Sequence, residues 1–145
     1  MNRYRWGHVC VAVLMTWAAG QSQAQMMNFG AVKATGAKPL SADEVKALVT
    51  DAQTRFLHAS GGERRWRNAP DGKFAATRTN GPVNRRNGAG TWSVRDDGAY
   101  CLSFDWGPMD NEKWCRLVYK VEDRYYAFGD AAPDEAPGGP YWFTR

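Results

Sequence analysis

Residues 90–128 read GTWSVRDDGAYCLSFDWGPMDNEKWCRLVYKVEDRYYAF, and this stretch decides the fold class. Short runs rich in aromatic and apolar residues alternate here with turn-forming residues, as at Asp96-Asp97-Gly98 and Glu122-Asp123. Such runs, bounded by Gly, Pro, Asn and Asp, are typical of an antiparallel β-meander. The stretch therefore predicts a mainly β protein.

The same pattern continues on both sides of this stretch, as expected for a single domain in a chain of 145 residues. Candidate strands lie at residues 63–69, 73–79, 90–95, 99–105, 112–121, 124–128 and 141–144. Residues 80–89 and 130–140 are rich in Gly, Pro, Asn and Asp, and they predict long mobile loops. We expect an antiparallel meander that forms a small curled sheet or barrel.

One N-terminal amphipathic helix precedes the strands. It begins with a capping box at Ser41-Ala42-Asp43-Glu44, in which Ser41 and Glu44 exchange hydrogen bonds. Apolar residues follow at helical spacing, namely Val45, Leu48, Val49, Ala52 and Phe56. Gly61 is the latest residue at which this helix ends, but the alternation over residues 54–58 also allows a strand to begin near Gln53. Propensity alone does not decide between these two alternatives.

The N-terminus has the pattern of an export signal. Arg3 and Arg5 precede an apolar run at 9–19, and Ser22-Gln23-Ala24 supplies small residues for cleavage. The run is too short to anchor the chain in a membrane. We therefore expect a signal peptide at 1–24, which makes the mature chain periplasmic or secreted. Residues 25–40 show no apolar period, and we expect a flexible leader before a single β-rich domain at 41–145.

Cleavage removes Cys10 and leaves Cys101 and Cys115, which we expect to form a disulfide in an oxidising compartment. This bond would centre the turn between their strands near Pro108. We pair Val94 with Cys101 and Tyr119 with Tyr126 across the neighbouring turns. One face then carries Trp92, Val94, Cys101, Cys115, Leu117, Tyr119, Tyr126 and Phe128, and we assign it to the interior. The other face carries Tyr100, Leu102, Phe104, Trp114, Val118 and Tyr125, and we expect the helix or a partner to cover it.

Several of these motifs resemble the bacterial domain-of-unknown-function family 995. The likeness rests on the Gly-Thr-Trp strand at 90–94, the segments 97–101, 114–116 and 118–119, and the helix start at 40–44. It runs over roughly Leu40 to Phe128 and implies a small exported protein with a paired-cysteine β core. The resemblance implies no catalytic residue. The chain departs from the family pattern around Asp51 to Gln53, where it has no glycine between the helix and the first strand.

The charges are unevenly distributed, although the formal net charge is only +4. Between residues 52 and 86 the acids are Glu63 and Asp71, and the bases are Arg55, Arg64, Arg65, Arg67, Lys73, Arg78, Arg85 and Arg86. Solvated strands and loops explain such segregation more often than a polyanion site does. We do not expect nucleic acid as a partner, because the compartment is wrong and the mature net charge is small.

The residue inventory argues against catalysis. His58 is the only histidine of the mature chain, and no serine lies in a nucleophile elbow. The best candidates for a catalytic group are Asp105, Asp110 and Glu112, because glycosidases use two carboxylates. Their position around the Gly107-Pro108 turn favours a structural role. We therefore expect that the protein is not an enzyme and uses no cofactor. We also expect no metal site, because two cysteines and one histidine make an incomplete zinc site.

The remaining candidates are binding residues. Trp66 and its neighbours Arg64, Arg65 and Arg67 have the side chains that anchor interfaces, and guanidinium groups bind carboxylates and phosphates. Alternation places Arg65 and Arg67 on the solvent side and Arg64 with Trp66 on the other. We expect Trp106 and Trp142, near strand ends, to be partly exposed. The sequence thus predicts an exported non-catalytic domain that binds an envelope protein or an anionic envelope polymer. The alternative is a lipocalin-like carrier whose tryptophans line a pocket for a small hydrophobic ligand.

Overall fold

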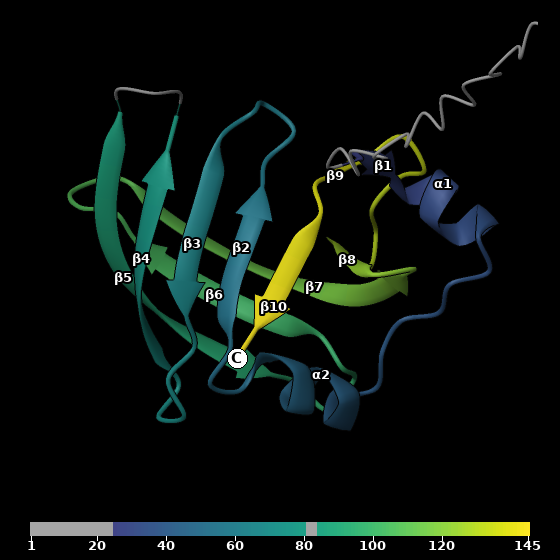
Figure 1. The fold of residues 1–145 in the computed structure, drawn as a ribbon, viewed down its shortest axis with the longest axis horizontal. Helices are drawn as coiled ribbons and strands as arrows, with labels where there is room; N and C mark the ends of the chain where they lie inside the picture. Colours follow the sequence, from purple (N-terminus) through teal and green to yellow (C-terminus); the bar gives the residue numbers. More distant parts are fainter. Residues whose placement is uncertain (1–24, 81–83) are drawn as a thin grey trace, which may run out of the picture.

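The computed structural model describes residues 25–80 and 84–145. Eight strands close into an antiparallel barrel in the order β10-β2-β3-β4-β5-β6-β7-β8 (Figure 1). These are β2 (Gln53–Leu57), β3 (Glu63–Arg67), β4 (Lys73–Thr79), β5 (Arg85–Val94), β6 (Tyr100–Asp105), β7 (Asn111–Val121), β8 (Arg124–Phe128) and β10 (Tyr141–Thr144). The predicted mainly β fold is confirmed, and closure leaves these strands without an open sheet edge.

The predicted capping box forms and starts helix α2 (Ala42–Val49). The Ser41 amide donates to Glu44 Oε2 at 2.8 Å, and the Ser41 hydroxyl accepts from the Glu44 amide. The helix stops before Asp51, whose φ of 57° is left-handed, so an aspartate occupies the conformation that usually favours glycine. Strand β2 follows at Gln53, which settles the alternative that the sequence leaves open. Helix α2 crosses one end of the barrel, where Val45 and Val49 join its core (Figure 1).

The predicted pairing of Val94 with Cys101 is wrong by one residue. The structure pairs Val94 with Tyr100 and Ser93 with Cys101. The cause is the turn between β5 and β6, in which Gly98 adopts a φ of 85° and adds a bulge residue. The other two predicted registers are confirmed, because Cys101 pairs with Cys115 and Tyr119 pairs with Tyr126.

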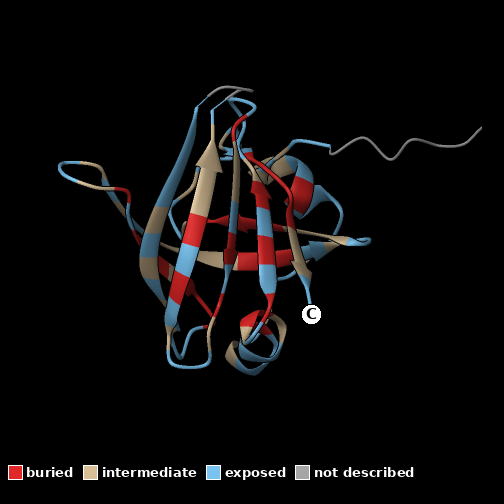
Figure 2. Ribbon diagram, turned by 60° about the vertical axis from the view of Figure 1, so that its left-hand side comes forward, coloured by how far each residue is buried: buried red, intermediate tan, exposed pale blue. Residues whose placement is uncertain are grey.

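The one-residue shift moves Trp92 and Val94 of β5 to the other face, and the predicted interior face of β6, β7 and β8 is also wrong. Tyr100, Leu102, Phe104 and Val118 are buried in the main core, and Trp92 packs against them. The face assigned to the interior from the sequence is instead the outer face of β6, β7 and β8. Figure 2 shows how buried and exposed residues alternate along the strands. A period of two means that a shift of one residue moves a whole row of side chains to the other face.

The outer apolar face is covered by the segment that we expected to be a flexible leader, and that prediction is wrong. Strand β1 (Met27–Asn28) pairs with β9 (Pro137–Gly138), and helix α1 (Phe29–Ala34) follows directly. Val32 on α1 is fully buried in a second cluster with Tyr119, Tyr126 and Phe128. A helix of six residues with one buried side chain shows no apolar period, so the sequence pattern does not reveal it.

Three further predictions concern loops and the N-terminus. The expected loop at 80–89 is shorter, since β5 begins at Arg85, and the expected loop at 130–140 contains β9. The predicted signal peptide at 1–24 lies outside the described residues. Within the described part of the chain, no helix has the length and apolar character needed to span a membrane.

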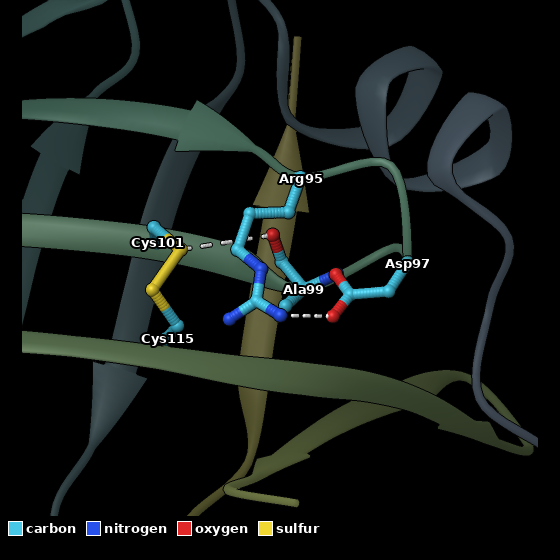
Figure 3. Close-up of a disulfide and its surroundings, with 5 residues drawn as sticks. All are labelled: Arg95, Asp97, Ala99, Cys101 and Cys115. Atoms are coloured by element: carbon cyan, nitrogen blue, oxygen red, sulfur yellow. Dashed lines mark hydrogen bonds and ion pairs between the residues drawn. A yellow bond between two sulfur atoms is a disulfide. The ribbon is translucent and has the colours of Figure 1, made fainter.

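The predicted disulfide between Cys101 and Cys115 is present and joins β6 to β7 (Figure 3). It encloses a chain segment with a sequence separation of 14 residues. Replacing both cysteines with serine is expected to lower the free energy of unfolding by about 3 kcal/mol, because the unfolded chain regains the entropy of an open loop. Urea unfolding with and without a reducing agent measures this loss. The double serine variant is the control, since its stability should not respond to the reductant; equal stability of the oxidised and reduced parent would contradict the prediction.

Candidate functional site

A row of outward-facing side chains crosses three neighbouring strands of the barrel. Trp142 on β10 pairs with Arg55 on β2, and Arg55 pairs with Arg65 on β3. The Arg55 guanidinium carbon lies 4.7 Å from the centre of the Trp142 ring, which is a cation–π distance. In the next row of the sheet, Thr144, Gln53 and Arg67 are paired in the same way. The register of β10, β2 and β3 therefore brings three arginines and one tryptophan onto one surface.

Two carboxylates fix the positions of these arginines. Glu63 Oε2 accepts from Arg55 Nε at 2.6 Å, and its other oxygen accepts from Arg65. Partial burial opposes ionisation of Glu63, but the hydrogen bonds from Arg65 and Arg55 outweigh it and hold its pKa below its ordinary value. Asp51 accepts from Arg67 at 2.9 Å. Each arginine has five N–H donors, so each keeps donors for an external ligand.

The two rows line an open hollow of about 500 Å³, which we call the tryptophan hollow. Its outward-facing lining residues are Gln53, Arg55, Arg65, Arg67, Trp142 and Thr144. Trp142 is half-buried, whereas the side chains of Arg65 and Arg67 are 65% and 62% exposed. The hollow thus offers one aromatic face and three guanidinium groups to a ligand. This arrangement suits carboxylate or phosphate groups next to an apolar or planar group.

The other predicted binding residues point into the barrel. Trp66 is 4% exposed, and its Nε1 donates to Asn68 Oδ1 and Tyr100 Oη, each at 3.1 Å. Arg64 lies on the same side, 2.7 Å from a Glu112 oxygen. The predicted grouping of Arg64 with Trp66, opposite Arg65 and Arg67, is confirmed. The role of Trp66 as an exposed interface anchor is not confirmed, because its ring belongs to the core.

Trp106 is also buried, with 5% of its surface exposed, so the prediction of partial exposure is wrong. Its ring stacks on Phe104 at 5.2 Å between centres. Gly88 on β5 makes room for it, since a Cβ at this position would lie 2.5 Å from the Trp106 ring. The structure therefore separates the six candidates into an outer set (Arg65, Arg67 and Trp142) and an inner set (Arg64, Trp66 and Trp106).

One known family matches a part of the chain that includes Arg65 and Arg67 of the outer set. The family model described as "Protein of unknown function (DUF995)" matches residues 11–115, more than two thirds of the chain. The chain belongs to the DUF995 family. No curated protein and no solved structure matches it. The part of this DUF995 protein that the model matches includes Arg55, Arg65 and Arg67, whereas Trp142 lies outside it.

The three carboxylates considered for catalysis have structural partners in this DUF995 barrel. Asp105 Oδ1 accepts from the Gly107 amide at 2.9 Å, as in a turn. Arg78 and Arg86 both bind Asp110, and the hydrogen bond from Arg78 holds the pKa of Asp110 below its ordinary value. Glu112 is bound by Arg64 and Arg78. Among the residues that the structure describes, no group of three His, Cys, Asp or Glu side chains is placed to hold a metal ion.

Arg55 is a site residue of this DUF995 protein that is not among the candidates predicted from the sequence. Its position follows from the pairing of β2 with β10, which are separated by most of the domain. The available signal was the alternation over residues 54–58, which allowed a strand beginning near Gln53 and would have placed Arg55 on its outer face. Only barrel closure brings Trp142 beside it.

Proposed function

We propose that this protein is an exported, non-catalytic domain that binds an anionic component of the cell envelope through the tryptophan hollow. The observation that carries the proposal is the stacking of Arg55 on Trp142 beside the exposed Arg65 and Arg67. Arginine and tryptophan are the residues that most often dominate binding energy at interfaces. The disulfide is compatible with an oxidising compartment outside the cytoplasm.

The packing of the barrel interior favours this proposal over a carrier of a small hydrophobic ligand. Phe56 stacks on Tyr141 at 4.4 Å, and Phe104 stacks on Trp106 at 5.2 Å. Rings that pack against one another occupy interior space that a ligand would need. A salt titration separates the two functions, since arginine-driven binding weakens as ionic strength rises, whereas binding in an apolar pocket does not.

Changing Arg65 and Arg67 together to serine tests the proposed site. Both side chains are exposed and form surface ion pairs, so we expect the free energy of unfolding to change by no more than about 1 kcal/mol. We expect the affinity for the anionic partner to fall at least about tenfold, because two charge-assisted contacts are lost. The measurement is titration calorimetry with the component that the mature protein captures from an envelope extract.

The matched control is Lys38→Ser with Lys113→Ser, which removes two exposed positive charges outside the tryptophan hollow. This variant should bind the partner like the parent. Equal loss of affinity in both double variants would show that net charge, rather than the tryptophan hollow, drives binding. An Arg65 and Arg67 variant that unfolds would assign these arginines to the fold instead.

A further inference from the structure

The tryptophan hollow is one of three neighbouring hollows among the described residues, two on the outside of the barrel and one at its rim. A second, which we call the middle hollow, has a volume of about 200 Å³ and is lined by Glu63, Arg65, Thr77, Thr79 and Arg85. A third, the rim hollow, has a volume of about 560 Å³ and is lined by Arg78, Asn80, Asn84, Arg85, Arg86 and Asp110. Arg65 belongs to the first two hollows, and Arg85 belongs to the last two. The hollows are therefore neighbours: the first two lie on the outer face, and the rim hollow lies at the mouth of the barrel, where Arg78 and Arg86 face inward.

A path along the three hollows crosses the strands rather than following one of them. It begins at Trp142 on β10, passes over β2, β3 and β4, and reaches Arg85 on β5, and these strands lie in this order in the sheet (Figure 1). Beyond Arg85 it turns over the rim of the barrel toward Arg86, which faces inward. Neighbouring strands are about 4.8 Å apart, so four such steps give a length of about 20 Å. A fully extended peptide of about six residues has this length.

Positive charge is repeated along the whole path. Six arginines line the three hollows, Arg55, Arg65, Arg67, Arg78, Arg85 and Arg86, whereas the carboxylates are Glu63 and Asp110. Each carboxylate is shared by two arginines, which are Arg55 and Arg65 at Glu63 and Arg78 and Arg86 at Asp110. Arg85 forms no ion pair with any residue in the described part of the chain. Arg78 is only 14% exposed and is held by Asp110 and Glu112, but the other five arginines are exposed and keep guanidinium donors for a ligand.

We propose that the three hollows act together as one track for a linear polyanion, a flexible chain that carries carboxylate or phosphate groups at regular intervals. This inference rests on the proposed function and specifies its partner. The outer surface of a closed barrel is convex, so a rigid, flat partner that contacts Trp142 is held away from Arg85. A flexible chain bends around the barrel and brings one anionic group to each cluster of arginines. Linked contacts of this kind raise affinity through effective concentration.

Oligomers of glutamate from the dipeptide to the dodecapeptide test the track, with binding measured by titration calorimetry at low ionic strength. We expect the affinity to rise by at least about tenfold between the dipeptide and the hexapeptide, and to change little beyond a length of about six residues. An affinity that does not depend on length would overturn the proposal. Linear polyphosphates of matched lengths then show whether phosphate or carboxylate is preferred.

Arg85→Ser separates the track from the tryptophan hollow alone. Arg85 lines the middle and rim hollows but not the tryptophan hollow. Because Arg85 forms no ion pair in the described part of the chain, replacing it leaves no carboxylate there unpaired. We expect this variant to bind the hexapeptide at least about fivefold more weakly and the dipeptide with unchanged affinity. The control is Lys113→Ser, which removes an exposed charge from β7 and should alter neither affinity.

Failure of the track differs from failure of the proposed function. If Arg85→Ser binds every oligomer like the parent while the Arg65 and Arg67 double variant binds weakly, the tryptophan hollow acts alone and the polyanion track is wrong. If neither variant changes the binding of the oligomers or of the captured partner, both proposals are wrong. A partner that proves to be a folded acidic protein, together with oligomer binding that does not depend on length, also overturns the track.

Discussion

Replacing Asn68 with alanine is expected to lower the free energy of unfolding by about 3–5 kcal/mol. Asn68 is fully buried at the end of β3, where it joins three parts of the fold. Its Oδ1 accepts from Trp66 Nε1 at 3.1 Å and from Tyr100 Oη at 2.9 Å, and its Nδ2 donates to the Val49 carbonyl at 2.9 Å. Alanine leaves these buried polar groups short of a partner, at about 1–3 kcal/mol each.

Chemical unfolding measures this loss, with Asn87→Ala as the matched control. Asn87 is exposed on β5, so its substitution should change stability by no more than about 0.5 kcal/mol. Should Asn68→Ala fail to fold, Tyr100→Phe tests the same network more gently. It removes one hydroxyl and should lower stability by about 1–2 kcal/mol. Burial raises the pKa of Tyr100 well above its ordinary value, because the buried site disfavours the charged phenolate. Parent-like stability in both variants would contradict the prediction.

The role of Asn68 could not be predicted from the sequence. A polar residue between Arg67 and Ala69, just before the turn at Pro70, has the pattern of a solvated strand end. Its burial depends on β6 and α2, which bring Tyr100 and Val49 to it from other parts of the chain. Local patterns report the period of a strand, but they contain no information about which distant element closes over its end.

Register shows a similar limit. The disulfide and the Glu122-Asp123 turn gave correct pairings, because each directly relates two neighbouring strands. At Asp96-Asp97-Gly98 the sequence allows more than one loop length, and the left-handed Gly98 selects the one that shifts β5 by a residue. That single residue moved Trp92 and Val94 of β5 to the opposite face. The interior of β6, β7 and β8 was assigned to the wrong side for another reason, because both faces of these strands are apolar. The strands themselves were largely predictable, whereas the side of the sheet that faces the core was not.

The candidate site shows the same difference between what local sequence patterns predict and what depends on distant strands. Alternation within β3 correctly placed Arg65 and Arg67 outside and Arg64 and Trp66 inside, since this requires only the period of a strand. Arg55 and Trp142 meet through the closing pairs of the barrel, which no local pattern predicts. The segregation of basic residues over 52–86 was visible in the sequence, but their arrangement in three neighbouring hollows depends on the order of the strands.

Trp106 and Trp142 lie near strand ends, but replacing each with alanine is expected to have very different effects. Trp106 is buried, stacks on Phe104 and lies 4.8 Å from the Arg78 guanidinium carbon. Trp106→Ala should therefore lower the free energy of unfolding by about 3–5 kcal/mol, through lost transfer energy and the cavity that remains. Trp142 is half-buried on the outer face, where the Arg55 guanidinium lies over its ring. Trp142→Ala should lower stability by only about 1–2 kcal/mol.

Gly88→Ala provides an independent test of why Trp106 is buried. The added Cβ would lie 2.5 Å from the Trp106 ring and 2.6 Å from the Asp105 carbonyl oxygen, so the ring or the strand must move. We expect a loss of about 1–3 kcal/mol in the parent, and a smaller loss when Trp106 is already alanine. A double-mutant cycle by urea unfolding measures this coupling. Independent effects of the two substitutions, or equal losses for Trp106→Ala and Trp142→Ala, would contradict the packing of Trp106 against β5.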